Sequence, residues 1–80
     1  MEKRIGAALI LVNEKEYVEK LNQLLSAFST IIIARQGVPF HDKGINIITI
    51  VLEGTNDQIN SLSGKLGRLK GIQVKTVFTK

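Results

Sequence analysis

The chain has 80 residues, of which 44% are hydrophobic and 22% charged, and its formal net charge is +4. This length predicts a single domain, residues 1–80, whose one core supplies only about 3–5 kcal/mol of net stability. The absence of cysteine excludes disulfides and thiolate metal sites. No apolar run approaches the roughly 20 residues of a membrane helix. We therefore expect a cytoplasmic protein with no membrane partner and no bound metal or cofactor.

The first apolar segment, residues 5–12, predicts a strand that is apolar on both faces. Alternate residues would form its two sides, with Ile5, Ala7, Leu9 and Leu11 on one and Gly6, Ala8, Ile10 and Val12 on the other. Gly6 and Ala8 keep their side flat. A flat side suits the close approach of a second sheet or a ligand, and it equally suits a helix packed on the sheet.

Apolar side chains then recur at helical spacing from Tyr17 to Phe28, and Asn13 is the expected N-cap of this first helix. Two further apolar segments, residues 29–38 and 45–52, are rich in isoleucine and other β-branched residues. They predict two strands joined by a hairpin-type connection at residues 39–44.

A second helix is expected after Gly54, because Thr55 and Gln58 have the spacing of a capping box. Gly64 and Gly67 interrupt its apolar stripe, which indicates either close packing against the sheet or an early helix end. The last segment, from Ile72 to Thr79, alternates apolar and polar residues after the turn residue Gly71. It predicts a half-exposed edge strand.

The predicted order βαββαβ belongs to the α+β class. Right-handed crossovers place both helices on one face of an antiparallel sheet with strand order 4-1-3-2. The central strands, residues 5–12 and 45–52, are then apolar on a face that no helix covers. We expect a homodimer or tetramer assembled through the sheet, with an interface formed by Gly6, Ala8, Ile10, Ile45 and Ile47.

Few residues suggest a binding site. Arg35 lies near the end of its strand, before Gly37 and a proline, and a guanidinium there can hold a carboxylate or phosphate. The alternative is a charge that protects a sheet edge from aggregation. His41 is the only histidine and lacks the partners of a metal site, so it is either a ligand contact or an exposed loop residue. The predicted ligand-binding residues are therefore Arg35, Gly37 and His41.

Catalytic patterns are missing. The sequence has no nucleophile with a base at recognisable spacing, no paired carboxylates and no glycine-rich phosphate loop, so we expect no catalysis. The RNA-recognition motif shares the βαββαβ order but needs stacking aromatic residues on its central strands. Those strands contain none here, so we expect no direct binding of nucleic acid.

Four segments of the chain, residues 17–28, 35–39, 62–67 and 71–76, resemble the family of regulators of the iron-only hydrogenase system. That family is similar to the C-terminal domain of the nickel-responsive repressor and, more loosely, to ACT domains. The resemblance implies a ferredoxin-like fold that assembles into dimers or tetramers through its sheets. It also implies small effectors bound between subunits.

The sequence departs from those larger relatives at three points. The repressor's nickel site uses several histidines and a cysteine, whereas this chain has one histidine and no cysteine. Amino-acid-binding ACT domains carry an Asp-x-Pro-Gly-like turn after the first strand, whereas residues 12–15 contain no glycine. The repressor's DNA-binding segment precedes its sensor domain, whereas the first strand here starts a few residues after Met1, so we expect no DNA binding by that route.

Three functions remain. The first is a non-catalytic, homo-oligomeric regulatory or ligand-sensing module. The second is a small dimeric enzyme with an apolar pocket between sheet and helices that contains a polar side chain, His41 or Arg35. The third is a module that binds a protein partner, such as a hydrogenase-maturation protein, through the basic residues of its second half. Those residues are Lys65, Arg68, Lys70, Lys75 and Lys80.

Overall fold

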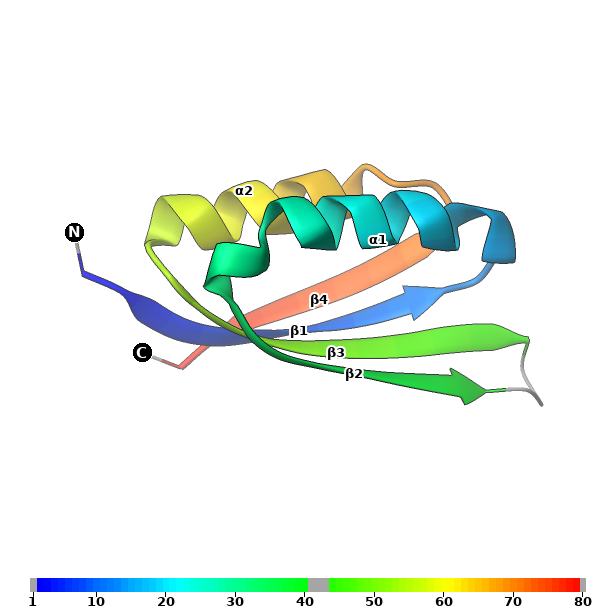
Figure 1. Ribbon diagram of the computed structural model, residues 1–80, viewed down its shortest axis with the longest axis horizontal. Coiled ribbons are helices and arrows are strands. Elements are labelled where there is room, and N and C mark those ends of the chain that lie inside the picture. The colour runs from blue at the N-terminus through cyan, green and yellow to red at the C-terminus, as the bar shows by residue number, and fades with distance from the viewer. Residues whose placement is uncertain (1, 41–43, 80) are drawn as a thin grey trace.

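Two helices lie side by side on one face of a four-stranded sheet, and the opposite face carries no helix (Figure 1). The computed structural model describes residues 2–40 and 44–79. The strand order, β2-β3-β1-β4, confirms the expected order and the α+β fold. The elements are β1 (Arg4–Val12), α1 (Val18–Ala27), β2 (Ile32–Phe40), β3 (Ile45–Gly54), α2 (Asn56–Gly67) and β4 (Ile72–Phe78), with short 3-10 turns at Lys15–Tyr17 and Ser29–Ile31.

All strand pairs are antiparallel, and β1 lies between β3 and β4. Ala8 is opposite Ile50 on one side and Thr76 on the other. The pairing of β2 with β3 contains a register shift between Ile32 and Ala34. Because one extra residue changes the side on which the following side chains lie, this bulge determines what the rest of β2 presents to the helices.

Hydrophobic side chains fill the space between the sheet and the helices. No polar or charged side chain is buried in the part of the chain that the structure describes. The core is therefore held together by apolar packing, which removes water from both helices and from one face of the sheet. Its members are Ala8, Ile10, Val12, Leu21, Leu25, Ile31, Ile48, Ile50, Leu52, Ile59, Leu62 and Leu66.

The two helices begin differently from each other. At α2 the capping box is confirmed, since the Thr55 hydroxyl accepts from the Gln58 backbone at 3.2 Å and the Thr55 backbone N–H donates to the Gln58 amide oxygen at 2.8 Å. The prediction of Asn13 as an N-cap is wrong, because a 3-10 turn intervenes and α1 starts at Val18. The Asn13 backbone instead extends the β1–β4 pairing, with its N–H donating to the Gly71 carbonyl at 2.8 Å.

The glycines and one strand boundary also differ in part from expectation. A Cβ at Gly64 or Gly67 would meet no atom within 4 Å, so the close packing proposed for them is wrong, and α2 ends at Gly67. Gly71 is confirmed as a turn residue, with φ of +70°. The second strand starts at Ile32 rather than Ser29, because residues 29–31 form a 3-10 turn.

Candidate functional site

The side of the sheet away from the helices, the open sheet face, exposes several large hydrophobic residues. Leu9 is 47% exposed, Ile5 45% and Val77 54%. The strand register places Ala7 between Val51 and Val77, so that apolar side chains continue across β3, β1 and β4. The described members of the face are Ile5, Ala7, Leu9, Leu11, Ala34, Gln36, Val38, Ile45, Ile47, Thr49, Val51, Glu53, Gln73, Lys75, Val77 and Thr79.

The structure corrects the expected interface on β1. Gly6, Ala8 and Ile10 lie beneath the helices, with Ala8 and Ile10 at most 1% exposed, so they cannot line the open sheet face. The tight packing at Gly6 comes from the neighbouring strand, since a Cβ there would lie 2.7 Å from the Val77 carbonyl oxygen. Ile45 and Ile47 do lie on the open sheet face, where both are half-buried.

Charge on the open sheet face is balanced. Among its described residues only Glu53 and Lys75 are charged, although the whole chain has a formal net charge of +4. Glu53 is opposite Ile5, and Lys75 is opposite Leu9. The face therefore has no net charge of its own to repel a second copy.

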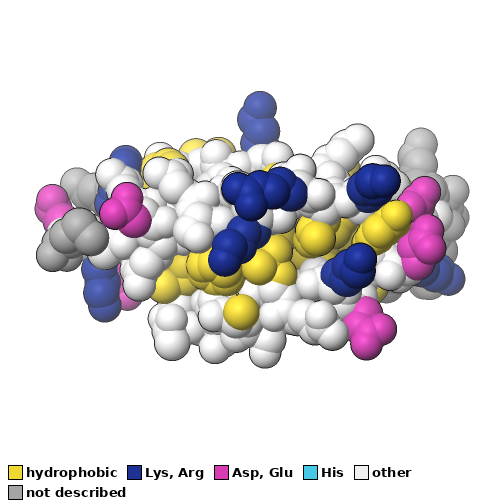
Figure 2. Space-filling view, turned by 90° about the horizontal axis from the view of Figure 1, so that it is seen from above, with side chains coloured by type: hydrophobic (Ala, Val, Ile, Leu, Met, Phe, Trp, Pro, Cys, Tyr) yellow, Lys and Arg dark blue, Asp and Glu magenta, His cyan; other side chains and the backbone are white. Residues whose placement is uncertain are grey.

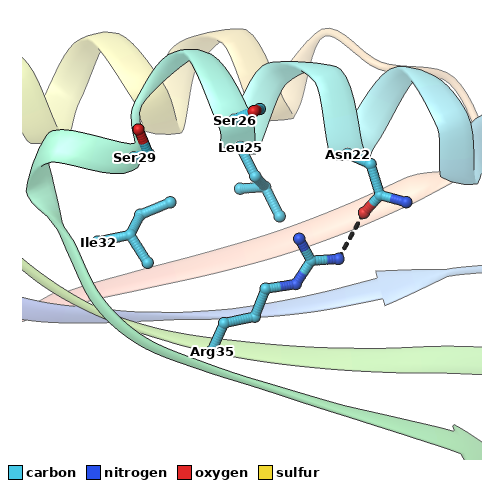
Figure 3. Close-up of a pocket in the computed structure, with 6 residues that line it drawn as sticks. All are labelled: Asn22, Leu25, Ser26, Ser29, Ile32 and Arg35. Atoms are coloured by element: carbon cyan, nitrogen blue, oxygen red, sulfur yellow. Dashed lines mark hydrogen bonds between the residues drawn. The ribbon is translucent and has the colours of Figure 1, made fainter.

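A second candidate is an open hollow of about 260 Å³ between α1 and β2, which we call the α1–β2 groove (Figure 3). Arg35 reaches from β2 toward α1, and its Nη2 donates a hydrogen bond to Oδ1 of Asn22. Arg35 is on this side of the sheet because the bulge places it opposite Ile50, a core residue. The groove is lined by Asn22, Leu25, Ser26, Ser29, Ile32 and Arg35.

The predicted ligand residues do not come together as one described cluster. Arg35 lines the groove, whereas Gly37 is exposed two residues farther along β2, with no atom within 4 Å of a Cβ there. His41 lies outside the described residues. Sequence reasoning missed Asn22, Ser26 and Ser29. Asn22 and Ser26 share a side of α1 at i, i+4 spacing, but nothing in the sequence places that side beside β2.

The basic residues of the second half lie on different faces. Lys65 on α2 has its ammonium 5.3 Å from the centre of the Phe28 ring, whereas Lys75 lies on the open sheet face. Lys80 lies outside the described residues. On the helix side, several lysines and arginines lie over the middle, and others lie toward the two ends, where the acids also lie (Figure 2). Because Lys65 and Lys75 lie on opposite sides of the sheet, the predicted basic residues do not all belong to one surface.

Two kinds of feature are absent from the described ranges, 2–40 and 44–79. No group of three or more histidine, cysteine, aspartate and glutamate side chains is arranged there to hold a metal ion. None of the helices in those ranges has the length and apolar character needed to cross a membrane.

A family model described as "TM1266-like: Iron-only hydrogenase system regulator, putative" matches residues 4–76. Among solved structures, the uncharacterized protein TM1266 of Thermotoga maritima is 41% identical with a TM-score of 0.94, over 99% of this chain and 100% of that one. An unknown protein of Galdieria sulphuraria is 18% identical with a TM-score of 0.61, over 99% of this chain and 46% of that one.

The divalent ion tolerance protein CutA1 of Ehrlichia chaffeensis is 16% identical with a TM-score of 0.51, over 100% of this chain and 85% of that one. The two more distant likenesses support the fold alone. The comparison with curated proteins finds no match. The family match covers nearly the whole chain, and the Thermotoga maritima protein agrees with it in both sequence and fold. The chain therefore belongs to the TM1266-like family of iron-only hydrogenase system regulators.

Proposed function

We propose that this protein is a non-catalytic regulatory module that works as a homo-oligomer, assembled through the open sheet face, and that responds to a small effector. The observation that carries this proposal is the exposure of large apolar side chains on a face without helices. Leu9 and Val77 alone are 47% and 54% exposed. Burying such side chains is worth about 25 cal/mol per Å² of apolar surface, which favours a cover over water.

A second copy of the chain is the cover that fits this face. Its two described charges, Glu53 and Lys75, are of opposite sign, so a copy turned by a two-fold rotation can bring unlike charges closer together. The area is also sufficient. With about 3.3 Å per residue and about 4.8 Å between strands, the face covers roughly 550 Å². Two copies would bury roughly 1,100 Å², above the roughly 1,000 Å² that a specific interface should exceed.

The small-enzyme alternative has less support. It requires a pocket between sheet and helices that contains a polar side chain, yet the core of the described residues contains only apolar ones. Arg35 lies at the edge of the sheet, in an open hollow, rather than in that core. The family is described as a regulator, which agrees with a module that binds and signals.

The test is the molecular mass in solution. We expect sedimentation equilibrium to give a dimer or tetramer for the unmodified protein at micromolar concentration. Leu9→Asp places a charge in the middle of the open sheet face, where pairing with a second copy would desolvate it. We expect this variant to remain folded by circular dichroism and to dissociate at least tenfold more readily.

Asn60→Asp is the matched control, because it adds the same charge at an exposed position on α2. We expect its mass to equal that of the unmodified protein. A monomeric unmodified protein, or an oligomer that survives Leu9→Asp unchanged, would contradict the proposal.

A further inference from the structure

We propose that the α1–β2 groove binds a small organic carboxylate with a short apolar chain, held by the guanidinium of Arg35. The inference rests on the proposed function, because it gives the chemical class of the small effector and the place where it binds. Four features of the groove carry it: the unused donors of Arg35, the other polar residues of the lining, the apolar floor and the balance of charge.

Among the described residues, 2–40 and 44–79, Arg35 is the only charged one that lines the groove, and no carboxylate of theirs pairs with it. Its one described hydrogen bond goes to Asn22. A guanidinium has five N–H donors in a rigid planar fork, so donors remain for a ligand, and two parallel N–H groups match the two oxygens of a carboxylate. The bond to Asn22 holds the guanidinium toward α1, beside the hollow (Figure 3).

The remaining lining has a polar and an apolar part. Leu25 is 2% exposed and Ile32 is half-buried, so together they offer an apolar floor. Ser26 and Ser29 are polar members of the lining on the helix side. A hollow of about 260 Å³ is below the range of about 300–1,000 Å³ for drug-sized ligands. The occupant is therefore a molecule with a carboxylate at one end and a few carbons at the other.

The charge balance favours a singly charged carboxylate over phosphate. One guanidinium compensates one negative charge, and none of the lysines that the structure describes lines the groove. The groove also runs along the second half of α1, toward the helix C-terminus, which carries the negative end of the helix dipole. That end disfavours a dianion more than a monoanion.

The experiment is an NMR titration of the full-length ¹⁵N-labelled protein with 3-methylbutanoate as the probe. We expect saturable shifts at the amides of the groove, centred on Asn22, Ser26 and Ile32, with a dissociation constant on the order of 1 mM. The neutral amide of the same shape, 3-methylbutanamide, should bind at least tenfold more weakly, because it lacks the charge that pairs with Arg35. This comparison of acid and amide uses only the unmodified protein, so it does not depend on whether a variant folds.

The variant arm uses Arg35→Gln, which keeps a polar side chain at an exposed position and should leave the fold intact. We expect it to weaken 3-methylbutanoate at least tenfold. Arg68→Gln is the matched control, because it removes the same charge from an exposed residue after α2, outside the groove, and should change binding less than twofold. Equal binding of acid and amide, or equal binding by Arg35→Gln, overturns the inference.

Sedimentation of the same samples separates this inference from the proposed function. An oligomer without a saturable response to the probe contradicts carboxylate binding in the groove but still supports self-association. A monomer that binds 3-methylbutanoate through Arg35 supports the groove and contradicts the assembly.

Discussion

The covered and open faces of the sheet differ in the polar groups that lie between their apolar side chains. On the covered face of β4, the hydroxyl of Thr76 is paired with that of Ser63 at 2.8 Å. Across the open sheet face, the row through Leu9 has Lys75 on one side and Thr49 on the other, both exposed. The covered face is thus suited to staying buried, whereas the open sheet face can also lie in contact with water.

This difference indicates what kind of contact the open sheet face makes. Permanent subunit interfaces resemble a domain core cut in half, whereas interfaces that form and separate are more polar. The polar residues in the row through Leu9 make the open sheet face similar to interfaces that form and separate, although Ile5 and Val77 give the face a large apolar content. Strand β1 belongs to both faces through its alternate residues, so neighbouring positions on one strand test the comparison directly.

The largest expected effect is that of Ile10→Asp. Ile10 is 0% exposed, and a carboxylate there has no partner among the core residues, so the loss exceeds about 4 kcal/mol. That is comparable to the whole net stability of about 3–5 kcal/mol expected for a core of this size. Circular dichroism should show an unfolded chain. Leu9→Asp, one residue away, should keep the folded spectrum, and an unfolded Leu9→Asp would mean that the two faces do not differ in this way.

The strand order could be predicted because the element order βαββαβ and right-handed crossovers together determine it. The two segments that are apolar on both faces, residues 5–12 and 45–52, agree with that order, since they lie within the central strands β1 and β3. The start of α2 was equally accessible, since Thr55 and Gln58 cap it through contacts within a few residues of each other. A general rule of chain topology gave the first feature, and local capping chemistry gave the second.

The assignment of faces on β1 could not be predicted. Both of its alternate sets are apolar, and Gly6 and Ala8 suit a covering helix as well as a second sheet. The α1–β2 groove could not be predicted for a different reason. Strict alternation from Ile32, which faces the core, would place Arg35 on the open sheet face, and only the bulge between Ile32 and Ala34 brings it to the helix side. The sequence contains no recognisable signal for that bulge.

Gly6→Ala is expected to have the next largest effect. Its Cβ would lie 2.7 Å from the Val77 carbonyl oxygen, and since backbone cannot easily move aside, we expect a loss of about 1–3 kcal/mol in the free energy of unfolding. Urea denaturation at a fixed protein concentration measures it. The control is Gly64→Ala, where the new methyl meets open space on an exposed helix and should stabilise the protein by up to about 1 kcal/mol.

The smallest expected effect comes from removing a single hydroxyl group, from Thr76 on the covered face or from Thr49 on the open sheet face. Thr76→Val keeps the shape of the side chain but leaves the half-buried Ser63 hydroxyl without its partner, so we expect a loss of about 1 kcal/mol in the free energy of unfolding. Thr49→Val removes an exposed hydroxyl on the open sheet face and should change that free energy by less than about 0.5 kcal/mol. It should also tighten self-association measured by sedimentation, because the row through Leu9 becomes more apolar. Equal losses from the two substitutions would show that the open sheet face is packed as tightly as the covered one.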